Sequence, residues 1–370
     1  MAKIELVNIC KKFEATKRGL FDNPLPRRTL PFVRREPFSI DNLNLTIPHG
    51  KTMVILGPSG CGKTTVLRII AGLVEPDSGE VLYNGTNMKD VPPGQRRIGM
   101  LFQSYALYPH LDSKTNILSY FFFRKKTPAM NAEAQAKYQR TAELMGVDIE
   151  YLHDRMPTTL SGGERQRVAL GRCITRDPQL FLLDEPFANL DQKLREKYRV
   201  NLKKLLDQFS ITTVYVTHDQ NEALILADLI AIMDAGKIVQ LGTYEDIYMR
   251  PTNLFVAEFL NPDTHTPPLN LIESRYLPNE RSDVQIGVRP EDIEVSAELQ
   301  DNRIIATVKD KLNLPMLNST VLTLRVGEDL IVASVPIATR ISLNDSVALK
   351  FRKYHVFDGK TGRRVRTNPA

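Results

Sequence analysis

The sequence contains no tryptophan and only three cysteines among its 370 residues. These cysteines, Cys10, Cys61 and Cys173, are too few and too widely spaced for a disulfide framework or a zinc site. Cys61 stands inside a glycine-rich segment that a disulfide would distort. This cysteine usage is typical of a protein that stays in a reducing cytosol.

A long hydrophobic run is also missing. The most apolar stretch, residues 223–233, is interrupted by Asp228 and is well short of the roughly 20 residues that a bilayer-spanning helix needs. Charged side chains such as Lys3 and Glu5 break any signal-peptide core near the N-terminus, so no cleavable signal is expected. If the protein acts at a membrane, we expect it to dock to another protein that spans the bilayer.

The overall composition is ordinary for a soluble globular protein, with 42% hydrophobic and 25% charged residues. A chain of 370 residues is too long for one compact core and predicts two domains. The net charge of +6 is mild. It is compatible with an anionic partner, such as a nucleotide or a lipid surface, and equally with a solvated basic face.

The pattern along the chain changes three times. Residues 14–37 contain four prolines and six Lys and Arg without hydrophobic periodicity, which predicts an inserted surface loop. Strand and helix patterns then alternate, and a mostly helical lobe is predicted at about 105–160. Short segments of alternating apolar and polar residues near the C-terminus indicate antiparallel β-structure. We therefore expect a first domain at 1–241 and a second at 242–370, with the boundary between 236 and 262.

A phosphate-binding pattern, G-x-x-x-x-G-K-[ST], is the first sign of chemistry. It reads Gly57-Pro58-Ser59-Gly60-Cys61-Gly62-Lys63-Thr64, and Thr65 follows it. Its glycines let backbone N–H groups wrap a β-phosphate, and the helix that starts here adds its dipole. Lys63 is predicted to reach the β- and γ-phosphates, and the Thr64 hydroxyl to bind Mg²⁺. A chance glycine-rich turn is the alternative, but the buried strand predicted at 52–56 and the amphipathic helix after the loop disfavour it.

Two acidic residues follow a second apolar run. The run at 180–183 is typical of a parallel strand buried on both faces, and Asp184 and Glu185 come directly after it. Ligands of open α/β sheets bind at the carboxyl ends of strands, so Asp184 is predicted in the Mg²⁺ shell. Glu185 is a candidate general base for an attacking water. The alternative is an acid pair that only caps the following turn.

The segment Ser161-Gly162-Gly163-Glu164 matches the capping-box pattern S-x-x-E ahead of a helix. It can therefore simply start a helix. Two glycines also allow close approach of a ligand to the backbone, and the positive helix end suits an anion. Both interpretations can hold together.

The Ser161 segment lies between the phosphate-binding loop and the acidic pair in the chain. Three motifs in that order resemble one large family, the ABC ATPases. The resemblance implies an α/β P-loop cassette with a helical lobe, which hydrolyses ATP with Mg²⁺ at the interface of a head-to-tail dimer. It implies that Ser161, Gly162 and Gly163 cover the γ-phosphate of ATP held by the other protomer, so that a second copy of the chain is a partner.

Four further positions match the family pattern. The resemblance implies that Gln103 links the Mg²⁺ and γ-phosphate site to the helical lobe, and that His218 contacts the γ-phosphate and orients the water and base. Asp191 lies in a loop that crosses the dimer interface. Phe13 corresponds to an aromatic that stacks on adenine, although a core or loop aromatic is a fair alternative there.

Residues 103–111 and 286–292 look like those of ATPase subunits of bacterial carbohydrate importers. That branch implies an OB-like, TOBE-type regulatory β-domain at 242–370. It also implies two transmembrane permease subunits, an extracytoplasmic substrate-binding protein, and a peripheral place on the cytoplasmic face of the bacterial inner membrane. Importers of polyamine, sulfate or ferric ion share this architecture and remain alternatives.

A soluble ABC ATPase of DNA repair or translation is a further alternative of a different class. Such a protein needs a long coiled-coil insertion or a second cassette, which this sequence lacks, and no nucleic-acid partner is expected. Two segments depart from the importer pattern, the insert at 14–37 and the aromatic and basic run at 120–126. Core packing explains the three phenylalanines of that run, and a docking or headgroup-facing surface is the alternative.

Overall fold

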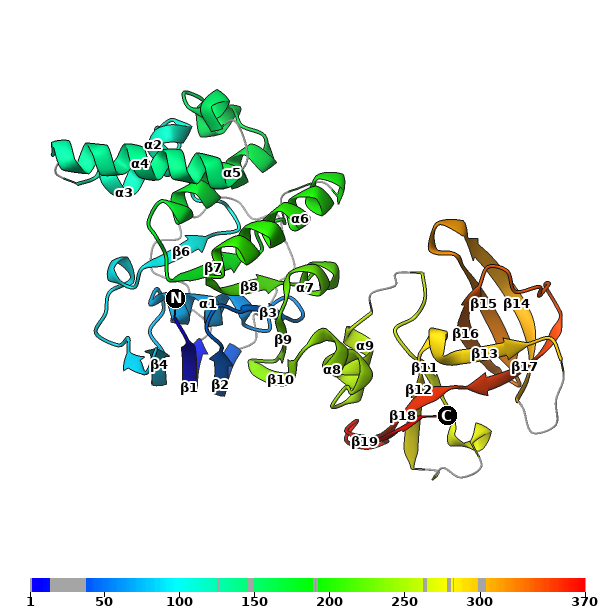
Figure 1. The fold of residues 1–370 in the computed structure, drawn as a ribbon. Helices are drawn as coiled ribbons and strands as arrows, with labels where there is room; N and C mark the ends of the chain where they lie inside the picture. The colour runs from blue at the N-terminus through cyan, green and yellow to red at the C-terminus, as the bar shows by residue number, and fades with distance from the viewer. Residues whose placement is uncertain are drawn as a thin grey trace, which may run out of the picture. The chain divides into compact units, whose positions relative to one another are not determined.

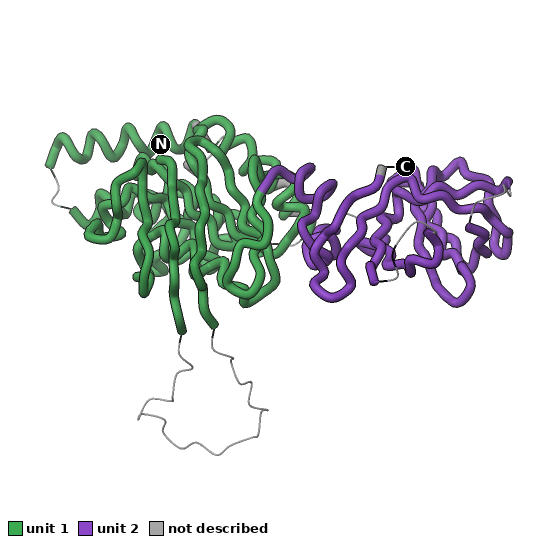
Figure 2. The backbone as a smooth tube through the Cα atoms, turned by 90° about the horizontal axis from the view of Figure 1, so that it is seen from below, with its two compact units in different colours: residues 1–241 green, residues 242–370 purple. Residues whose placement is uncertain are grey.

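The computed structural model describes residues 2–13, 38–124, 127–145, 149–188, 190, 192–261, 265–277, 281, 283–298 and 304–369. The predicted insert at 14–37 and the candidate residue Asp191 lie outside the described residues. The chain forms two compact units, Met1–Leu241 and Gly242–Ala370 (Figure 2). Within the described ranges, none of the helices has the length and apolar character that crossing a bilayer requires.

A six-stranded sheet lies at the centre of the first unit (Figure 1). In spatial order its strands are β10 (Lys237–Gly242), β9 (Leu229–Asp234), β3 (Thr52–Leu56), β8 (Thr212–Thr217), β7 (Leu180–Asp184) and β6 (Ile98–Leu101). The strands from β9 to β6 pair in parallel. All residues of β3 and β7 are buried, which explains their continuous apolar sequence. Because parallel strands end at one edge, the loops after β3, β8, β7 and β6 lie next to one another.

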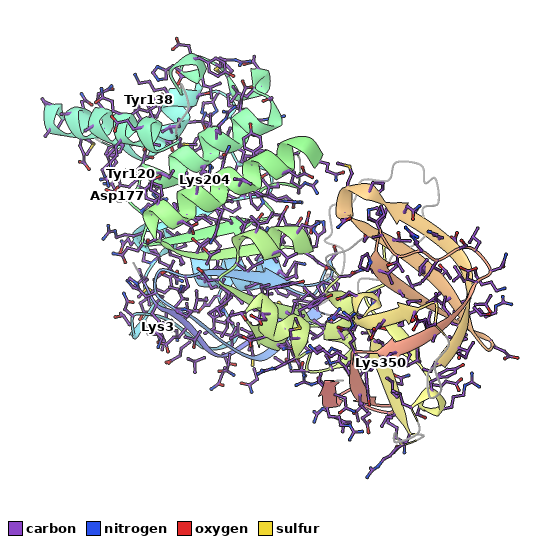
Figure 3. The ribbon with its side chains drawn as sticks, turned by 45° about the vertical axis from the view of Figure 1, so that its right-hand side comes forward. Lys3, Tyr120, Tyr138, Asp177, Lys204 and Lys350 are labelled. Atoms are coloured by element: carbon purple, nitrogen blue, oxygen red, sulfur yellow. The ribbon has the colours of Figure 1, made fainter. Side chains whose placement is uncertain are left out.

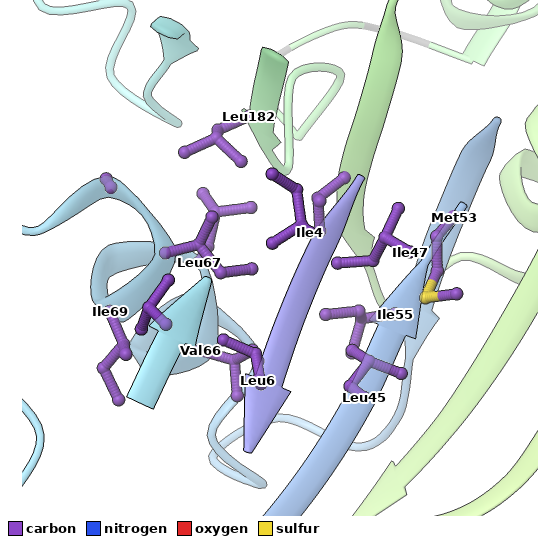
Figure 4. Packing of buried hydrophobic residues seen from close by; sticks show 14 of the residues in the cluster. Ile4, Leu6, Leu45, Ile47, Met53, Ile55, Val66, Leu67, Ile69 and Leu182 are labelled. Atoms are coloured by element: carbon purple, nitrogen blue, oxygen red, sulfur yellow. The ribbon is translucent and has the colours of Figure 1, made fainter. Parts of the chain in front are cut away.

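A second, antiparallel sheet packs on the same core. Its strands are β2 (Phe38–Ile47), β1 (Ile4–Phe13), β4 (Ser78–Tyr83) and β5 (Thr86–Asn87). Alternate side chains of β1 and β2 point inward, and Ile4 pairs in register with Ile47. Figure 4 shows these two residues packed with Ile55 of β3 and Leu67 of helix α1 (Lys63–Ala71). The phosphate-binding loop therefore runs between a buried strand and a helix that are fixed by one hydrophobic core.

The other α-helices described in this unit form two groups, a helical lobe of four helices and a flanking pair. The lobe consists of α2 (Ser113–Ile117), α3 (Ser119–Phe122), α4 (Pro128–Met145) and α5 (Gly162–Ile174). It has its own core, in which Tyr138 of α4 (Figure 3) packs with Ile117, Leu152, Leu160 and Val168. The flanking pair is α6 (Gln192–Phe209) and α7 (Gln220–Leu226).

The aromatic run at 121–123 divides between core and surface. Phe121 is buried, whereas Phe122 and Phe123 are 43% and 61% exposed. The Phe123 ring packs edge-on against Tyr108, with centroids 5.4 Å apart. Core packing thus explains the first phenylalanine and not the other two.

The second unit consists of short helices and two antiparallel sheets. The helices are α8 (Tyr244–Met249) and α9 (Leu254–Phe259). One sheet has the order β11 (Asn270–Ile272), β12 (Val284–Val288), β18 (Lys353–Asp358) and β19 (Arg364–Pro369). The other has the order β13 (Ile293–Ser296), β17 (Ser346–Phe351), β14 (Ile304–Leu314), β15 (Ser319–Val326) and β16 (Asp329–Pro336). The antiparallel β-structure predicted for this region is confirmed.

A buried histidine lies inside the second unit. His355 of β18 is 1% exposed, and its Nδ1 is 2.9 Å from the hydroxyl of Thr367 on β19. Burial, followed by the positive charges of Arg289, Lys353 and Arg364, lowers the pKa of His355 to about 3. The imidazole is therefore neutral in the folded protein at neutral pH.

Candidate active site

The phosphate-binding loop connects the end of β3 to the start of α1. Gly60 and Gly62 have φ angles of +84° and +107°, in the left-handed region that glycine tolerates best. A Cβ at Gly62 would also lie 2.3 Å from Cζ of Phe38. Phe38 in turn stacks on Phe13, with ring centroids 6.2 Å apart. Phe38 therefore lies between the loop and Phe13, the residue predicted to stack on adenine, and Phe13 itself is 39% exposed.

Lys63 folds back over the loop that precedes it. Its Nζ donates to the carbonyl oxygens of Gly57 and Pro58, both at 2.9 Å. The Lys63 side chain is buried, so its ammonium group lies among the backbone carbonyls of the loop rather than in solvent. Burial also raises the pKa of the neighbouring Cys61 thiol, which keeps this cysteine protonated.

Thr64 in the first turn of α1 meets Asp184 at the end of β7. The Thr64 hydroxyl donates to Oδ1 of Asp184 at 2.8 Å. Asp184 is the last residue of β7 and is buried, which raises the pKa of its carboxyl, while the Thr64 hydrogen bond acts in the opposite direction. A hydroxyl and a carboxylate oxygen are the hard ligands that Mg²⁺ prefers. No group of three or more His, Cys, Asp or Glu with metal-site geometry occurs among the described residues.

Gln103, Glu185 and His218 come together as a second cluster. Nδ1 of His218 lies 3.1 Å from Oε1 of Glu185, and Nε2 of Gln103 donates to Oε2 of the same carboxylate at 3.4 Å. Glu185 has a φ of +43°, and its backbone N–H donates to the carbonyl of Val216 in β8 at 3.0 Å. Two side chains from separate loops, Gln103 and His218, therefore converge on the Glu185 carboxylate at the carboxyl edge of the sheet.

The start of α5 is a complete capping box. The Ser161 hydroxyl accepts from the backbone N–H of Glu164 at 3.3 Å, and the Glu164 carboxylate accepts from the Ser161 N–H at 2.7 Å. A Cβ at Gly163 would lie 2.3 Å from the hydroxyl oxygen of Tyr198 on α6. The glycine at this position therefore has a packing reason in addition to any contact with a ligand.

Sequence reasoning missed two sets of residues that hold the site's loops. Arg172 of α5 donates to the backbone carbonyls of Tyr105 and Ala106, at 2.9 and 2.7 Å. These two residues closely follow Gln103 in the chain, and both have positive φ angles. Arg199 of α6 donates to Asp219, the residue after His218. A cation on an amphipathic helix carries no local signal of such contacts, because it equally fits a solvated face.

Comparison with known proteins places this site in a family. The sequence profile described as ABC transporter matches residues 40–188. The trehalose/maltose import ATP-binding protein MalK of Thermococcus litoralis is 38% identical, over 89% of this chain and 96% of that protein. The sn-glycerol-3-phosphate import ATP-binding protein UgpC 1 of Rhizobium etli is 37% identical, over 99% of each chain.

A solved structure gives the same result. The dimeric post-hydrolysis state of the ATP-binding cassette MJ0796, bound to ADP and Pi, is 30% identical with a TM-score of 0.53. The match covers 65% of this chain and 98% of that one. The chain belongs to the ABC transporter family and is an ATPase. The predicted fold class and enzymatic class are both confirmed.

Proposed function

We propose that this ATPase energises a binding-protein-dependent importer of a sugar or a sugar derivative. The names of the two relatives support this substrate class, since one concerns import of trehalose and maltose and the other import of sn-glycerol-3-phosphate. The convergence of Gln103, Glu185 and His218 next to the Thr64 and Asp184 pair carries the proposal that the site hydrolyses ATP. Importers of polyamine, sulfate or ferric ion are the alternative.

The residues at the loop fit a Mg²⁺ ion bound together with ATP. Thr64, Asp184 and the side-chain oxygen of Gln103 would hold it, together with oxygen atoms of phosphate and water. When bound, the ion neutralises negative charge that develops on the phosphates. The hydrogen bond between Thr64 and Asp184 prepares two of these oxygens, because it already brings them within 2.8 Å.

Different residues of the chain have different roles in ATP hydrolysis. The backbone N–H groups of the phosphate-binding loop bind and orient the phosphates, and Lys63 exchanges its carbonyl contacts for phosphate oxygens. Glu185 accepts a proton from the attacking water through a carboxylate oxygen. His218 and Gln103 hold that carboxylate from either side and keep it aimed at the water. Phe13 stacks on the adenine.

A second copy of the chain completes the site in this proposal. The first turn of α5 presents Ser161, Gly162 and Gly163 to ATP bound by the partner protomer, where the positive end of the helix dipole favours an anion. The dimeric state of the related cassette supports this arrangement. Asp191 would lie at the same interface, although it falls outside the described residues.

Two transmembrane permease subunits are the other proposed partners, with substrate delivered to them by an extracytoplasmic binding protein. A cavity of about 650 Å³ opens beside the exposed aromatic side chains of the helical lobe, and its lining includes Phe102, Tyr108, Tyr120, Phe123 and Arg176. This mixture of aromatic side chains and arginine suits a protein interface. Docking there would place the protein at the cytoplasmic face of the membrane, and the second unit would serve as a regulatory domain.

The replacement Glu185→Gln tests the proposed chemistry. It keeps the side chain's size but cannot accept a proton, so steady-state ATP hydrolysis should fall by roughly 10²- to 10⁴-fold while MgATP still binds. Glu143→Gln, an exposed site on α4, is the matched control and should retain wild-type turnover. Near-normal hydrolysis by Glu185→Gln would remove Glu185 as the base.

The substrate class is tested separately in the assembled transporter. Purification of the chain with its permeases and binding protein, followed by reconstitution in liposomes, allows ATPase stimulation to be measured with each candidate. Stimulation by a disaccharide or a sugar phosphate, and not by sulfate, spermidine or ferric ion, supports the proposal. Stimulation by one of the latter three alone replaces it with the alternative.

A further inference from the structure

A buried network of charged side chains adjoins the loop that carries His218. Arg199 of α6 is 7% exposed and Glu222 of α7 is 4% exposed. Nη2 of Arg199 donates to Oδ2 of Asp219 at 2.6 Å, and its Nε lies 3.9 Å from Oε1 of Glu222. Arginine and glutamate are almost never buried to this extent unless they are paired. The pairing joins α6 to the first turn of α7.

The network fixes both chain neighbours of His218. Oε2 of Glu222 accepts from the hydroxyls of Thr217 and Tyr215, at 2.6 and 2.7 Å. Oδ1 of Asp219 caps α7, since it accepts from the Glu222 N–H at 3.2 Å. The backbone N–H of Asp219 also donates to the Thr217 hydroxyl at 3.0 Å. Hydrogen bonds from buried side chains therefore hold Thr217 and Asp219, the residues before and after His218, in place.

The His218 side chain itself is not packed in the core. It is 55% exposed, and its Nδ1 reaches Oε1 of Glu185 at 3.1 Å. Because an exposed ring is not confined by surrounding side chains, its place depends on the backbone that carries it. That backbone is held by the charged network.

The same helix also reaches the loop that follows Glu185. Nη1 of Arg195, one turn before Arg199, lies 3.5 Å from Oδ2 of Asp219. Its Nη2 donates to the carbonyl of Leu190 at 3.2 Å. One oxygen of Asp219 thus meets two arginines, and α6 connects the loop after Glu185 with the loop that carries His218.

We propose that Arg199 is a positioning residue for ATP hydrolysis. Through Asp219 and Glu222 it fixes the loop after β8 so that the His218 imidazole meets the Glu185 carboxylate. The inference rests on the proposed function, in which Glu185 and His218 act on the attacking water. The competing explanation is that the buried pair contributes only to the stability of the fold.

Histidine NMR separates these explanations because the chain has only six histidines. With ¹³C-labelled histidine, the Cε1–H signal of His218 is assigned by its loss in His218→Gln. In the wild-type background, Glu185→Gln should shift this signal because the two side chains are in contact. In Arg199→Gln, the signal should move or broaden, and adding Glu185→Gln should no longer shift it.

Kinetics give the second readout. A small displacement of a reacting group costs up to about 100-fold in rate, so kcat of Arg199→Gln should fall about 10- to 100-fold while KM for MgATP stays within about threefold. Arg199→Lys keeps the charge and should recover part of the loss. Lys203→Gln is the matched control, because this lysine lies on the same helix and pairs with Asp207 one turn away. It should leave both kcat and the His218 signal unchanged.

Two results would overturn the inference. One is a folded Arg199→Gln protein whose His218 signal, and the response of that signal to Glu185→Gln, match wild type. The other is a wild-type His218 signal that does not respond to Glu185→Gln. If Arg199→Gln does not fold, Asp219→Asn takes the same measurements with the same criteria, since its amide oxygen still caps α7. Normal hydrolysis by Glu185→Gln would refute the proposed base and would leave the NMR comparison intact.

Discussion

Replacing Gly163 by alanine distinguishes a packing role from a nucleotide role at the start of α5. An ideal Cβ at this position would lie 2.3 Å from Oη, 2.6 Å from Cζ and 2.7 Å from Cε2 of Tyr198. Relaxed contacts between such atoms are about 3.5 Å, so the tyrosine ring has to move by roughly 1 Å. Forcing an extra carbon into a packed position costs about 1–3 kcal/mol. We therefore expect Gly163→Ala to lower the free energy of unfolding of the first unit by that amount.

A double-mutant cycle with Tyr198→Leu tests this directly. Leucine lacks the three atoms that would meet the new Cβ, so the double variant should be more stable than the sum of the single changes by about 1–3 kcal/mol. Unfolding by urea measures the stability, and Gly94→Ala is the control, because a Cβ there would meet nothing within 4 Å. A coupling energy near zero would refute the packing argument. If stability returns in the double variant but ATP hydrolysis does not, the glycine also serves the nucleotide.

Two further predictions concern pH and the phosphate-binding loop. The pKa of His355 is about 3 in the folded protein and near 6.5 in the unfolded chain, so the unfolded state binds more protons between these values. Its contribution to stability is complete above pH 6.5 and is lost as the pH falls, by about 2 kcal/mol between pH 7 and 5. His355→Gln should remove this part of the pH dependence in urea unfolding, and an unchanged pH profile would contradict it. In the loop, Gly62→Ala should destabilise more than Gly60→Ala by about 1–3 kcal/mol, because both have positive φ but only the first would place a Cβ against Phe38. Equal melting temperatures of the two variants would argue against that contact.

Local patterns in the sequence predicted much of the fold. The strand expected at 52–56 is β3 to the residue, because a fully buried parallel strand leaves a continuous apolar signature. The helix after the phosphate-binding loop and the capping box at Ser161 were equally visible, since each depends on residues within a few positions of one another.

The arrangement of the site was accessible only through family resemblance. Gln103 and Glu185 lie 82 positions apart in the chain, and no periodicity predicts that they share a hydrogen bond. The contacts of Arg172 and Arg199 were not predicted, because a cation on a helix has the same local pattern whether it meets solvent or a carbonyl. Tyr198 packing against Gly163 likewise follows from the way α6 and α5 approach each other, which local sequence does not encode.

The capping box at Ser161 determines which further hydrogen bonds its hydroxyl can form. A serine hydroxyl has one proton to donate and two lone pairs that accept. Capping α5 uses a lone pair, because the hydroxyl accepts from the Glu164 N–H. The cap does not use the proton of the Ser161 hydroxyl, and it holds the oxygen that bears this proton in a fixed position. The bond that starts the helix thus leaves this hydroxyl able to donate. A phosphate oxygen of the partner's ATP, in the proposed dimer, could therefore be bound without breaking the cap.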